Sequence, residues 1–473
     1  MRRPATALFL VASIILSATT VRPYTLQFTD ASTPVQIKWA AGTINIALSP
    51  SLASPPANIK AGSNVLRAAR RALARWSEAA NIQFVEVSSS AQSISAAGGN
   101  GDGISLITIA HTPENSALFT GASSVVPGRT RVFFTQTGVI TEADIVLNPG
   151  QQFSADGTPG TYDLEATLMH EIGHLLGLEH SSVVGATMQP RQGKNGIYGL
   201  SAWTSRTLSD DDRAGVRAMY GVRAGLRAWG AIAGVINFAG GLPAPGANVW
   251  AEEAATGRTS ASSITLANGA YRIEGLLPGK YRVVVEALNG PVMASEIASA
   301  RGAYAGLATQ SPAFRTLEIG EARVVAGITT ALNAQLSSEP KLLNPSLIGI
   351  NEQLSTVAVP LAAGKTQTVY LSGEGLNANQ MQNISVSATS PFIKVNAKSI
   401  RPQQYSDNIF AISFDLTVKA GAPAGDYSLR LQTSNGEVAY IAGGLAIDDA
   451  WHTAGPAPQS QTPAAPPALG EGQ

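Results

Sequence analysis

The stretch from His170 to His180 reads His-Glu-Ile-Gly-His-Leu-Leu-Gly-Leu-Glu-His and restricts the local fold more than any other part of the chain. Two histidines four residues apart lie one turn from each other on the same face of a helix, so the imidazoles of His170 and His174 reach one ion. Gly177 lets the backbone leave that helix in a conformation that other residues resist. The turn can then bring His180 back as a third ligand. Three neutral nitrogens with one open position are typical of a catalytic metal site.

The chemistry that we expect at this site is amide hydrolysis. Zinc lowers the pKa of a bound water toward about 7 and polarises a carbonyl. Glu171, beside the first ligand, can take the water's proton and pass it to the leaving amine. We therefore predict that Glu171 is catalytic and that His170, His174 and His180 hold zinc. The alternatives are histidines that are only buried and hydrogen-bonded, or a closed structural zinc site.

Hydrophobic periodicity predicts a domain of mixed helices and strands over residues 36–222. Apolar residues recur at three- and four-residue steps from Val65 to Ala80 and again from Leu164 to Leu176, where Asp163 or Thr161 can cap the helix. A last helix is expected over Asp210–Tyr220, ending at Gly221. The predicted strands are rich in β-branched residues and lie within Gln36–Leu48, Ile82–Val87, Ile104–Ile109, Arg131–Phe134 and Ala143–Leu147.

The passage His170–His180 resembles the zinc-binding consensus of the metzincins, and among these it is most similar to the matrixins. For residues 36–222 the resemblance implies an α+β fold with a twisted mixed sheet and an active-site helix. Ser181 after the third histidine and the eight-residue step from His180 to Met188 favour matrixins over other metzincin families. The resemblance implies that Ala186–Pro190 is the Met-turn, with Met188 below the metal and Pro190 in the wall of the specificity pocket. It also implies that Leu208–Gly221 contains the closing helix, in which Asp211 ties back to the Met-turn.

In matrixins a peptide substrate lies along an edge strand by strand addition, and Leu118–Ser124 is our choice for that strand. A second, structural zinc is doubtful, because His111 is the only histidine upstream of the motif. Structural calcium stays open through scattered acidic residues such as Asp102 and Asp144. The chain has no cysteine, so disulfides, thiolate ligands and thiol-based latency are excluded.

Two all-β sandwich domains are expected after the zinc domain. Residues 228–337 resemble the carboxypeptidase regulatory-like, prealbumin-like module, in which short strands such as Ala247–Ala251 and Tyr281–Val285 alternate with Gly- and Pro-containing turns. Residues 340–448 have an immunoglobulin-like pattern, including Gly425–Leu429 before a strand. The tail 453–473 is rich in Pro and Ala, which predicts disorder.

The start of the chain resembles a secretory signal peptide over residues 1–20, since two arginines precede an apolar run from Ala5 to Ala18. The alternative is a short membrane anchor, although the run is shorter than the roughly 20 residues that a span needs. We expect the mature protein outside the cytoplasm, secreted or periplasmic. A length of 473 residues predicts several domains, and 44% hydrophobic with 14% charged residues predicts a folded chain.

The sequence thus predicts a secreted zinc endopeptidase acting on extracellular proteins, with attachment to a cell surface or matrix through the C-terminal β domains. Lys+Arg and Asp+Glu are equal at 32 each and form no charged block, so nucleic acid is not an expected partner. We expect a monomer. The alternative function is a catalytically inactive zinc-binding adhesion protein.

Overall fold

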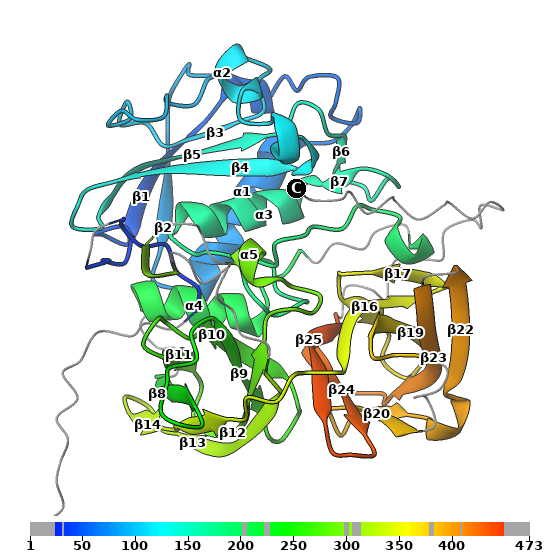
Figure 1. The fold of residues 1–473 in the computed structure, drawn as a ribbon. Coiled ribbons are helices and arrows are strands. Elements are labelled where there is room, and N and C mark those ends of the chain that lie inside the picture. The colour runs from blue at the N-terminus through cyan, green and yellow to red at the C-terminus, as the bar shows by residue number, and fades with distance from the viewer. Residues whose placement is uncertain are drawn as a thin grey trace, which may run out of the picture.

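The computed structural model describes residues 24–30, 33–200, 206–221, 228–297, 302–304, 314–377, 383–406 and 409–448. An α+β unit (residues 24–221, the N-terminal unit) is followed by two β-rich units, which we call the middle unit (230–336) and the C-terminal unit (344–447) (Figure 1). The predicted signal peptide and the predicted disordered tail lie outside the described residues. Within those residues no helix is both long and apolar enough to cross a membrane.

The N-terminal unit contains one mixed five-stranded sheet with the order β2-β1-β3-β5-β4. Neighbouring strands are parallel except for β4, which runs antiparallel to β5. The sheet is therefore mixed, as predicted. Its strands are β1 (Thr43–Leu48), β2 (Gln83–Val87), β3 (Leu106–Thr108), β4 (Gly128–Phe134) and β5 (Ile140–Leu147), and the helices are α1 (Val65–Ala79), α2 (Pro113–Ser116), α3 (Leu164–Leu175) and α4 (Asp210–Tyr220). A short pair, β6 (Phe153–Ser154) and β7 (Tyr162–Asp163), precedes α3.

The edge strand beside α3 is β4, and the prediction of Leu118–Ser124 for this strand is wrong. Residues 118–124 follow the short helix α2 and enter a 3-10 helix, Gly121–Val125. Thr112 caps α2 and Pro113 occupies its first turn, which favours a helical start. Gly121 then has a φ of +59°, which a regular strand does not allow.

Helix α3 is buried on nearly every side, because α1 and the sheet enclose it. The side chain of Asp163 caps α3 by accepting the Glu165 and Ala166 amides, both at 3.0 Å. On α1, the buried indole of Trp76 donates to the Met169 carbonyl at 2.9 Å. These contacts fix the helix that carries the first two histidines.

The N-terminal unit begins before the predicted boundary at Gln36. Tyr24 and Leu26 are 1% exposed and belong to its core. Leu26 pairs with Leu178 in an isolated bridge, and the Gln27 amide donates to the Gly177 carbonyl at 2.9 Å. The first described residues therefore hold the turn that follows α3.

The middle unit contains two sheets, with the orders β10-β9-β12-β13 and β11-β8-β14, and β15 also pairs with β8. Their inward-facing residues, including Val249, Tyr271 and Val283, form a separate buried cluster. This arrangement agrees with the predicted sandwich. The elements are β8 (Gly230–Phe238), β9 (Ala247–Glu253), β10 (Thr259–Ile264), β11 (Ala270–Leu276), β12 (Gly279–Ala287), α5 (Ala294–Ile297), β13 (Leu317–Val324), β14 (Thr329–Ala331) and β15 (Ala334–Leu336).

The C-terminal unit is also all-β, as predicted, with the sheet orders β17-β16-β19-β23-β21 and β18-β25-β24-β20, and β22 pairs with β23. Its immunoglobulin-like character stays a prediction. The strands are β16 (Asn344–Ile350), β17 (Gln353–Ser355), β18 (Val359–Leu361), β19 (Thr366–Glu374), β20 (Ile384–Ala388), β21 (Ile393–Val395), β22 (Arg401–Ser406), β23 (Ile409–Val418), β24 (Gly425–Thr433) and β25 (Val438–Ile447).

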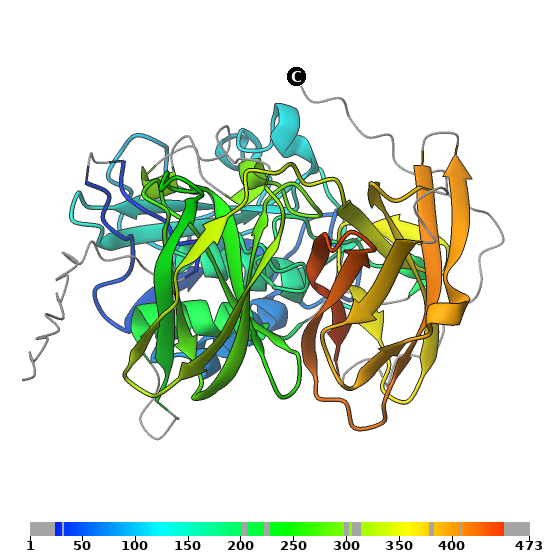
Figure 2. The same cartoon turned by 60° about the horizontal axis from the view of Figure 1, so that its bottom comes forward.

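The two β units lie side by side against the N-terminal unit (Figures 1 and 2). A buried ion pair joins Lys341 Nζ to Glu286 Oε1 at 2.9 Å, and the same carboxylate oxygen accepts the Tyr440 amide at 3.2 Å. The ring of Tyr440 meets that of Trp250 edge-on, with centroids 5.3 Å apart. Glu286 of β12 therefore links the middle unit to β25 of the C-terminal unit.

Replacing Lys341 by Met should destabilise the folded chain by roughly 3–5 kcal/mol, because the Glu286 carboxylate would stay buried without its cation. Denaturant unfolding monitored by fluorescence measures this loss. Lys60→Met is the control, since Lys60 pairs with Asp156 at 2.5 Å where both side chains are exposed, and should cost less than about 1 kcal/mol. Equal losses for the two variants would contradict this account of the interface.

Candidate metal centre

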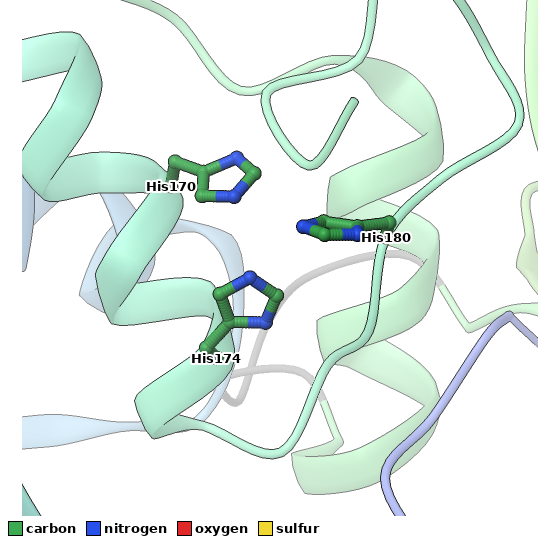
Figure 3. A group of neighbouring side chains, drawn as sticks. All are labelled: His170, His174 and His180. Carbon is green, nitrogen blue, oxygen red and sulfur yellow. The ribbon is translucent and has the colours of Figure 1, made fainter. Parts of the chain in front are cut away.

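The three predicted histidine ligands converge in the structure. His170 and His174 project from α3, and His180 approaches from the segment after the turn (Figure 3). One ligand nitrogen from each ring lies within 4.8 Å of the other two. The ring centroids are separated by 4.9 Å, 5.3 Å and 4.9 Å. The arrangement brings all three imidazoles within reach of a single ion.

Each imidazole is oriented by a backbone carbonyl. The Nδ1 atom of His170 lies 2.8 Å from the Thr187 oxygen, that of His174 lies 2.9 Å from the Leu178 oxygen, and that of His180 lies 2.6 Å from the Glu296 oxygen. A carbonyl only accepts hydrogen bonds, so each Nδ1 carries the hydrogen and each Nε2 keeps its lone pair. This donor set fits zinc, which binds neutral imidazole nitrogens whose second nitrogen is tied to a carbonyl.

The electrostatics also favour neutral histidines. Burial lowers the pKa of His170 to about 3, with a smaller contribution from the charge of His180. Burial likewise lowers the pKa of His174 well below its usual range and lowers that of His180. The imidazoles are therefore unprotonated at neutral pH, which is the form that binds a metal. His174 and His180 keep partly exposed surface, as an open coordination position requires.

Gly177 makes the turn that returns the chain from α3 to His180. Its φ is +96°, and a Cβ atom there would lie 2.4 Å from the Ile37 carbonyl oxygen. Both the conformation and the space therefore require glycine. The Glu179 amide then donates to the Thr25 carbonyl at 2.8 Å, which holds the returning segment against the first described residues.

Glu171 follows the first ligand on α3, and its carboxylate lies against the edge strand β4. Thr130 Oγ1 donates to Glu171 Oε2 at 2.6 Å, and a Cβ atom at Gly128 would lie 2.7 Å from Oε1. Burial raises the pKa of Glu171 to about 7, while the Thr130 hydrogen bond and the charge of Arg129 oppose this rise. Thr130 and Gly128 were not predicted as site residues, although alternation along a strand places them on the same face.

Met188 lies below α3, close to the histidines. It is fully buried, and a Cβ atom at Gly173 would lie 2.2 Å from its sulfur. The Ser181 amide donates to the Met188 carbonyl at 2.8 Å, which ties the turn to the residue after His180. Pro190 follows two residues later and is partly buried.

The aspartate that binds this turn is Asp212, so the prediction of Asp211 for that role is corrected. Asp212 accepts the Thr187 amide at 2.8 Å and the Met188 amide at 3.1 Å. Adjacent residues on a helix point about 100° apart, so Asp211 faces elsewhere. It accepts the Ser181 hydroxyl at 2.5 Å and the Ser262 amide of β10 at 2.6 Å. Asp212 also completes a capping box with Ser209, which its three-residue spacing could have indicated.

A small cavity of about 60 Å³ lies beside the Met-turn. Its wall comes mainly from the N-terminal unit, but Val357 and Ala358 of the C-terminal unit also line it. Gln189 Nε2 donates to the Thr356 carbonyl at 3.3 Å, which holds this wall to the C-terminal unit. Pro190 itself is not a lining residue; the N-terminal part of the lining is Ala166, Val184, Gly185, Ala186, Thr187, Gln189, Arg191, Gln192 and Gly193.

Two of the acidic groups near β5 are buried. Burial raises the pKa of Asp144 to about 7, and the charges of Glu142 and Asp102 add to the rise. Glu142 is fully buried, and within the described ranges its Oε1 has no hydrogen-bond partner. His111 Nε2 donates one hydrogen bond to Asn58 Oδ1 at 3.0 Å. Among the described residues, the only metal-ligating cluster of three side chains is that of the three histidines.

Comparison with known families agrees with this geometry. Residues 51–221 match the Matrixin family model, and residues 231–337 match that of the Carboxypeptidase regulatory-like domain. The chain therefore contains a matrixin domain followed by a carboxypeptidase regulatory-like domain. Both resemblances inferred from the sequence are confirmed.

Individual relatives align over the matrixin part. Metalloendoproteinase 1-MMP of Arabidopsis thaliana is 32% identical over 165 residues, which cover 33% of this chain and 38% of the relative. Matrix metalloproteinase-20 of Homo sapiens is 28% identical over 193 residues, covering 40% of this chain and 34% of the relative. The chain thus spans little more than a third of either relative. BcpA, the major pilin subunit of Bacillus cereus, aligns with 45% of this chain and 66% of its own at 13% identity, but its TM-score of 0.16 supports no structural argument.

Replacing Gly177 by Ala should destabilise the protein by more than about 2 kcal/mol and lower its zinc content, because positive φ costs roughly 1–2 kcal/mol and the Ile37 carbonyl must also move. Gly62→Ala is the matched control, since Gly62 has a φ of +85° with no atom within 4 Å of the added Cβ. Thermal unfolding and metal analysis measure the two effects. Similar losses of stability for both variants would show that the Ile37 contact contributes nothing.

Proposed function

We propose that this chain is a zinc-dependent endopeptidase that hydrolyses peptide bonds of proteins outside the cytoplasm. The observation that carries the proposal is the convergence of three neutral imidazoles within 4.8 Å, with Glu171 next to the first of them. The matrixin match over 51–221 supports the same reaction class. The chain aligns with little more than a third of each relative. Its activity and its substrate are therefore proposals.

The residues of the site divide the chemical work among them. When bound, zinc supplies a water of lowered pKa and polarises the scissile carbonyl. Glu171 accepts the proton of that water and transfers it to the leaving amine. The Thr130 hydroxyl holds Oε2 of the carboxylate in place at 2.6 Å. Burial raises the pKa of the Glu171 carboxyl, which strengthens the carboxylate as a proton acceptor.

Peptide binding is proposed along β4. Among the described strands its only neighbour in the sheet order is β5, so its other edge can pair with an extended peptide. Gly128 and Thr130 of this strand lie against Glu171, which would bring the added peptide beside the general base. The cavity at the Met-turn would take one substrate side chain, and its small volume favours a side chain of limited size.

Export and attachment complete the proposal. The sequence of residues 1–20 supports secretion or release to a periplasm. We propose that the protein acts as a monomer and that the β-rich units hold it near a cell surface or matrix. The alternative is a zinc-binding adhesion protein without catalytic activity, which the next experiment separates from the enzyme.

Replacing Glu171 by Gln should leave about one zinc per chain and lower proteolysis at least about 100-fold, because the metal ligands remain and the base is lost. Zinc is measured by atomic absorption, and activity by cleavage of a peptide library. Glu78→Gln, at an exposed position of α1, is the control and should keep both properties. A zinc-loaded wild-type protein that cleaves neither the library nor denatured protein would favour the adhesion function.

We also propose a calcium ion at the carboxylates of Glu142 and Asp144; Asp102 is left out, because among the described residues no acidic side chains bring three ligand atoms within 4.8 Å of one another. The free Oε1 of Glu142 supports this, because a buried carboxylate oxygen without a partner is costly. Oxygen ligands of this kind are those that calcium prefers. The loop before Asp102 allows the carboxylate to approach closely, since a Cβ atom at Gly101 would lie 2.2 Å from Glu142 Oε2.

Calcium should raise the melting temperature of the wild-type protein and should do so more at pH 8 than at pH 5. Asp144 has a raised pKa without the ion, so its contribution to stability is present below about pH 4 and is lost as pH rises through about 7. The ion would offset that loss. Glu142→Gln should abolish the calcium effect, whereas Glu78→Gln on the exposed surface should retain it. If calcium does not change the melting temperature of the wild-type protein at pH 8, the proposed calcium site is wrong.

A further inference from the structure

We propose that the middle unit is a structural part of the zinc centre, because its Glu296 carbonyl orients the third ligand, His180. This inference rests on the proposed zinc site and goes beyond it. Zinc affinity then depends on how the middle unit docks on the matrixin domain. Glu296 acts as a positioning residue, since it touches the ligand and not the reacting atoms.

The three carbonyl acceptors differ in origin. Thr187 is 17 residues from His170, and Leu178 is 4 residues from His174, so the N-terminal unit supplies both of these acceptors itself. Glu296 is 116 residues from His180 and belongs to α5, in the connection between β12 and β13 of the middle unit. His180 also lies outside α3, so no helix fixes its position. The orientation of His180 therefore depends on contacts from another unit. The orientations of His170 and His174 depend on such contacts less.

The carbonyl of Glu296 is held in place by the side chain of the same residue. Arg191 Nε donates to Glu296 Oε1 at 2.6 Å, and the Met293 amide donates to Oε2 at 2.8 Å. Arg191 belongs to the wall segment next to Pro190, and its Nη1 also reaches the Pro291 carbonyl at 3.5 Å. The carboxylate thereby links α5 to the wall of the site. The Arg191–Glu296 ion pair is partly exposed, so its direct contribution to stability is small. Its role is to hold α5 in position.

Neighbouring contacts attach the residues after His180 to the middle unit as well. The Ser182 hydroxyl donates to Asn248 Oδ1 of β9 at 2.6 Å. Asp211 joins the Ser181 hydroxyl to the Ser262 amide of β10. Ile297, at the end of α5, is 1% exposed and packs into the shared core. The segment that carries His180 is thus held between the N-terminal unit and the middle unit. Zinc binding must therefore be thermodynamically linked to the docking of the middle unit on the N-terminal unit.

The test measures zinc affinity of the full chain by competition with a chelator of known affinity. Glu296→Ala should weaken zinc binding about tenfold, because the Glu296 carbonyl remains but loses the side-chain contacts that hold it toward His180; this is the lower end of the effect of disturbing a partner that orients a ligand. Arg191→Ala should act in the same direction, and the double variant should lose no more than the stronger single one, since both remove the same link. Glu296→Gln keeps one acceptor oxygen, which can serve either Met293 or Arg191 but not both, and should therefore bind zinc with an affinity between those of Glu296→Ala and the wild type.

A second readout reports the ligand geometry directly. The visible absorption bands of the cobalt-substituted protein should shift in Glu296→Ala and return toward the wild-type positions in Glu296→Gln. Glu86→Ala is the matched control, because Glu86 pairs with Arg70 at 2.7 Å far from the histidines, and its zinc affinity and spectrum should not change. Should Glu296→Ala fail to fold, Arg191→Ala and Glu296→Gln decide the question.

Zinc affinity of Glu296→Ala within twofold of the wild type, with an unchanged cobalt spectrum, would overturn the inference. Neither readout requires proteolysis, so the outcome is separable from the proposed function. A wild-type protein that binds zinc but cleaves no peptide would refute only the enzymatic proposal. A wild-type protein that binds no zinc would refute both.

Discussion

Three hydrogen bonds from histidine Nδ1 atoms to backbone carbonyls determine the geometry of the candidate metal centre. Each bond fixes which nitrogen carries the hydrogen and which one faces the other two rings. A carbonyl moves only if its backbone moves. The positions of the three imidazoles therefore depend on how accurately the fold places α3, the Met-turn and α5. The surrounding structure serves that placement through the Asp163 cap, the Trp76 indole and the Gly177 turn.

The same segment of chain, from Ser181 to Tyr198, joins the site to both β-rich units. Asp212 holds the Met-turn from within the matrixin domain, while Asp211 on the adjacent position bonds to β10. Tyr198, whose φ is +60°, donates its hydroxyl to the Ile348 and Val357 carbonyls of the C-terminal unit. The wall of the cavity is therefore fixed from outside the matrixin domain. Buried polar contacts therefore join the matrixin domain to both β-rich units.

Local patterns in the sequence predicted much of this. The spacing of His170, His174 and His180 identified the cluster, and periodicity located α1, α3, α4 and the strands, because these features depend on residues a few positions apart. Features that depend on tertiary packing were missed or misplaced. The edge strand was assigned ten residues too early, to a segment that follows the capped helix α2 and whose positive φ at Gly121 does not fit a strand. Asp211 was chosen in place of its neighbour, and no local signal links Glu296 to a histidine so far away.

The distance in sequence between His180 and its acceptor also orders the assembly of the protein in time. A ribosome that adds 5–20 residues per second would deliver Glu296 roughly 6 to 23 s after His180, given the 116 residues between them. During that interval the acceptors of His170 and His174 are completed within the N-terminal unit, whereas His180 still lacks the carbonyl that orients it. Maturation of the centre is thus postponed until a later-made module has folded against it.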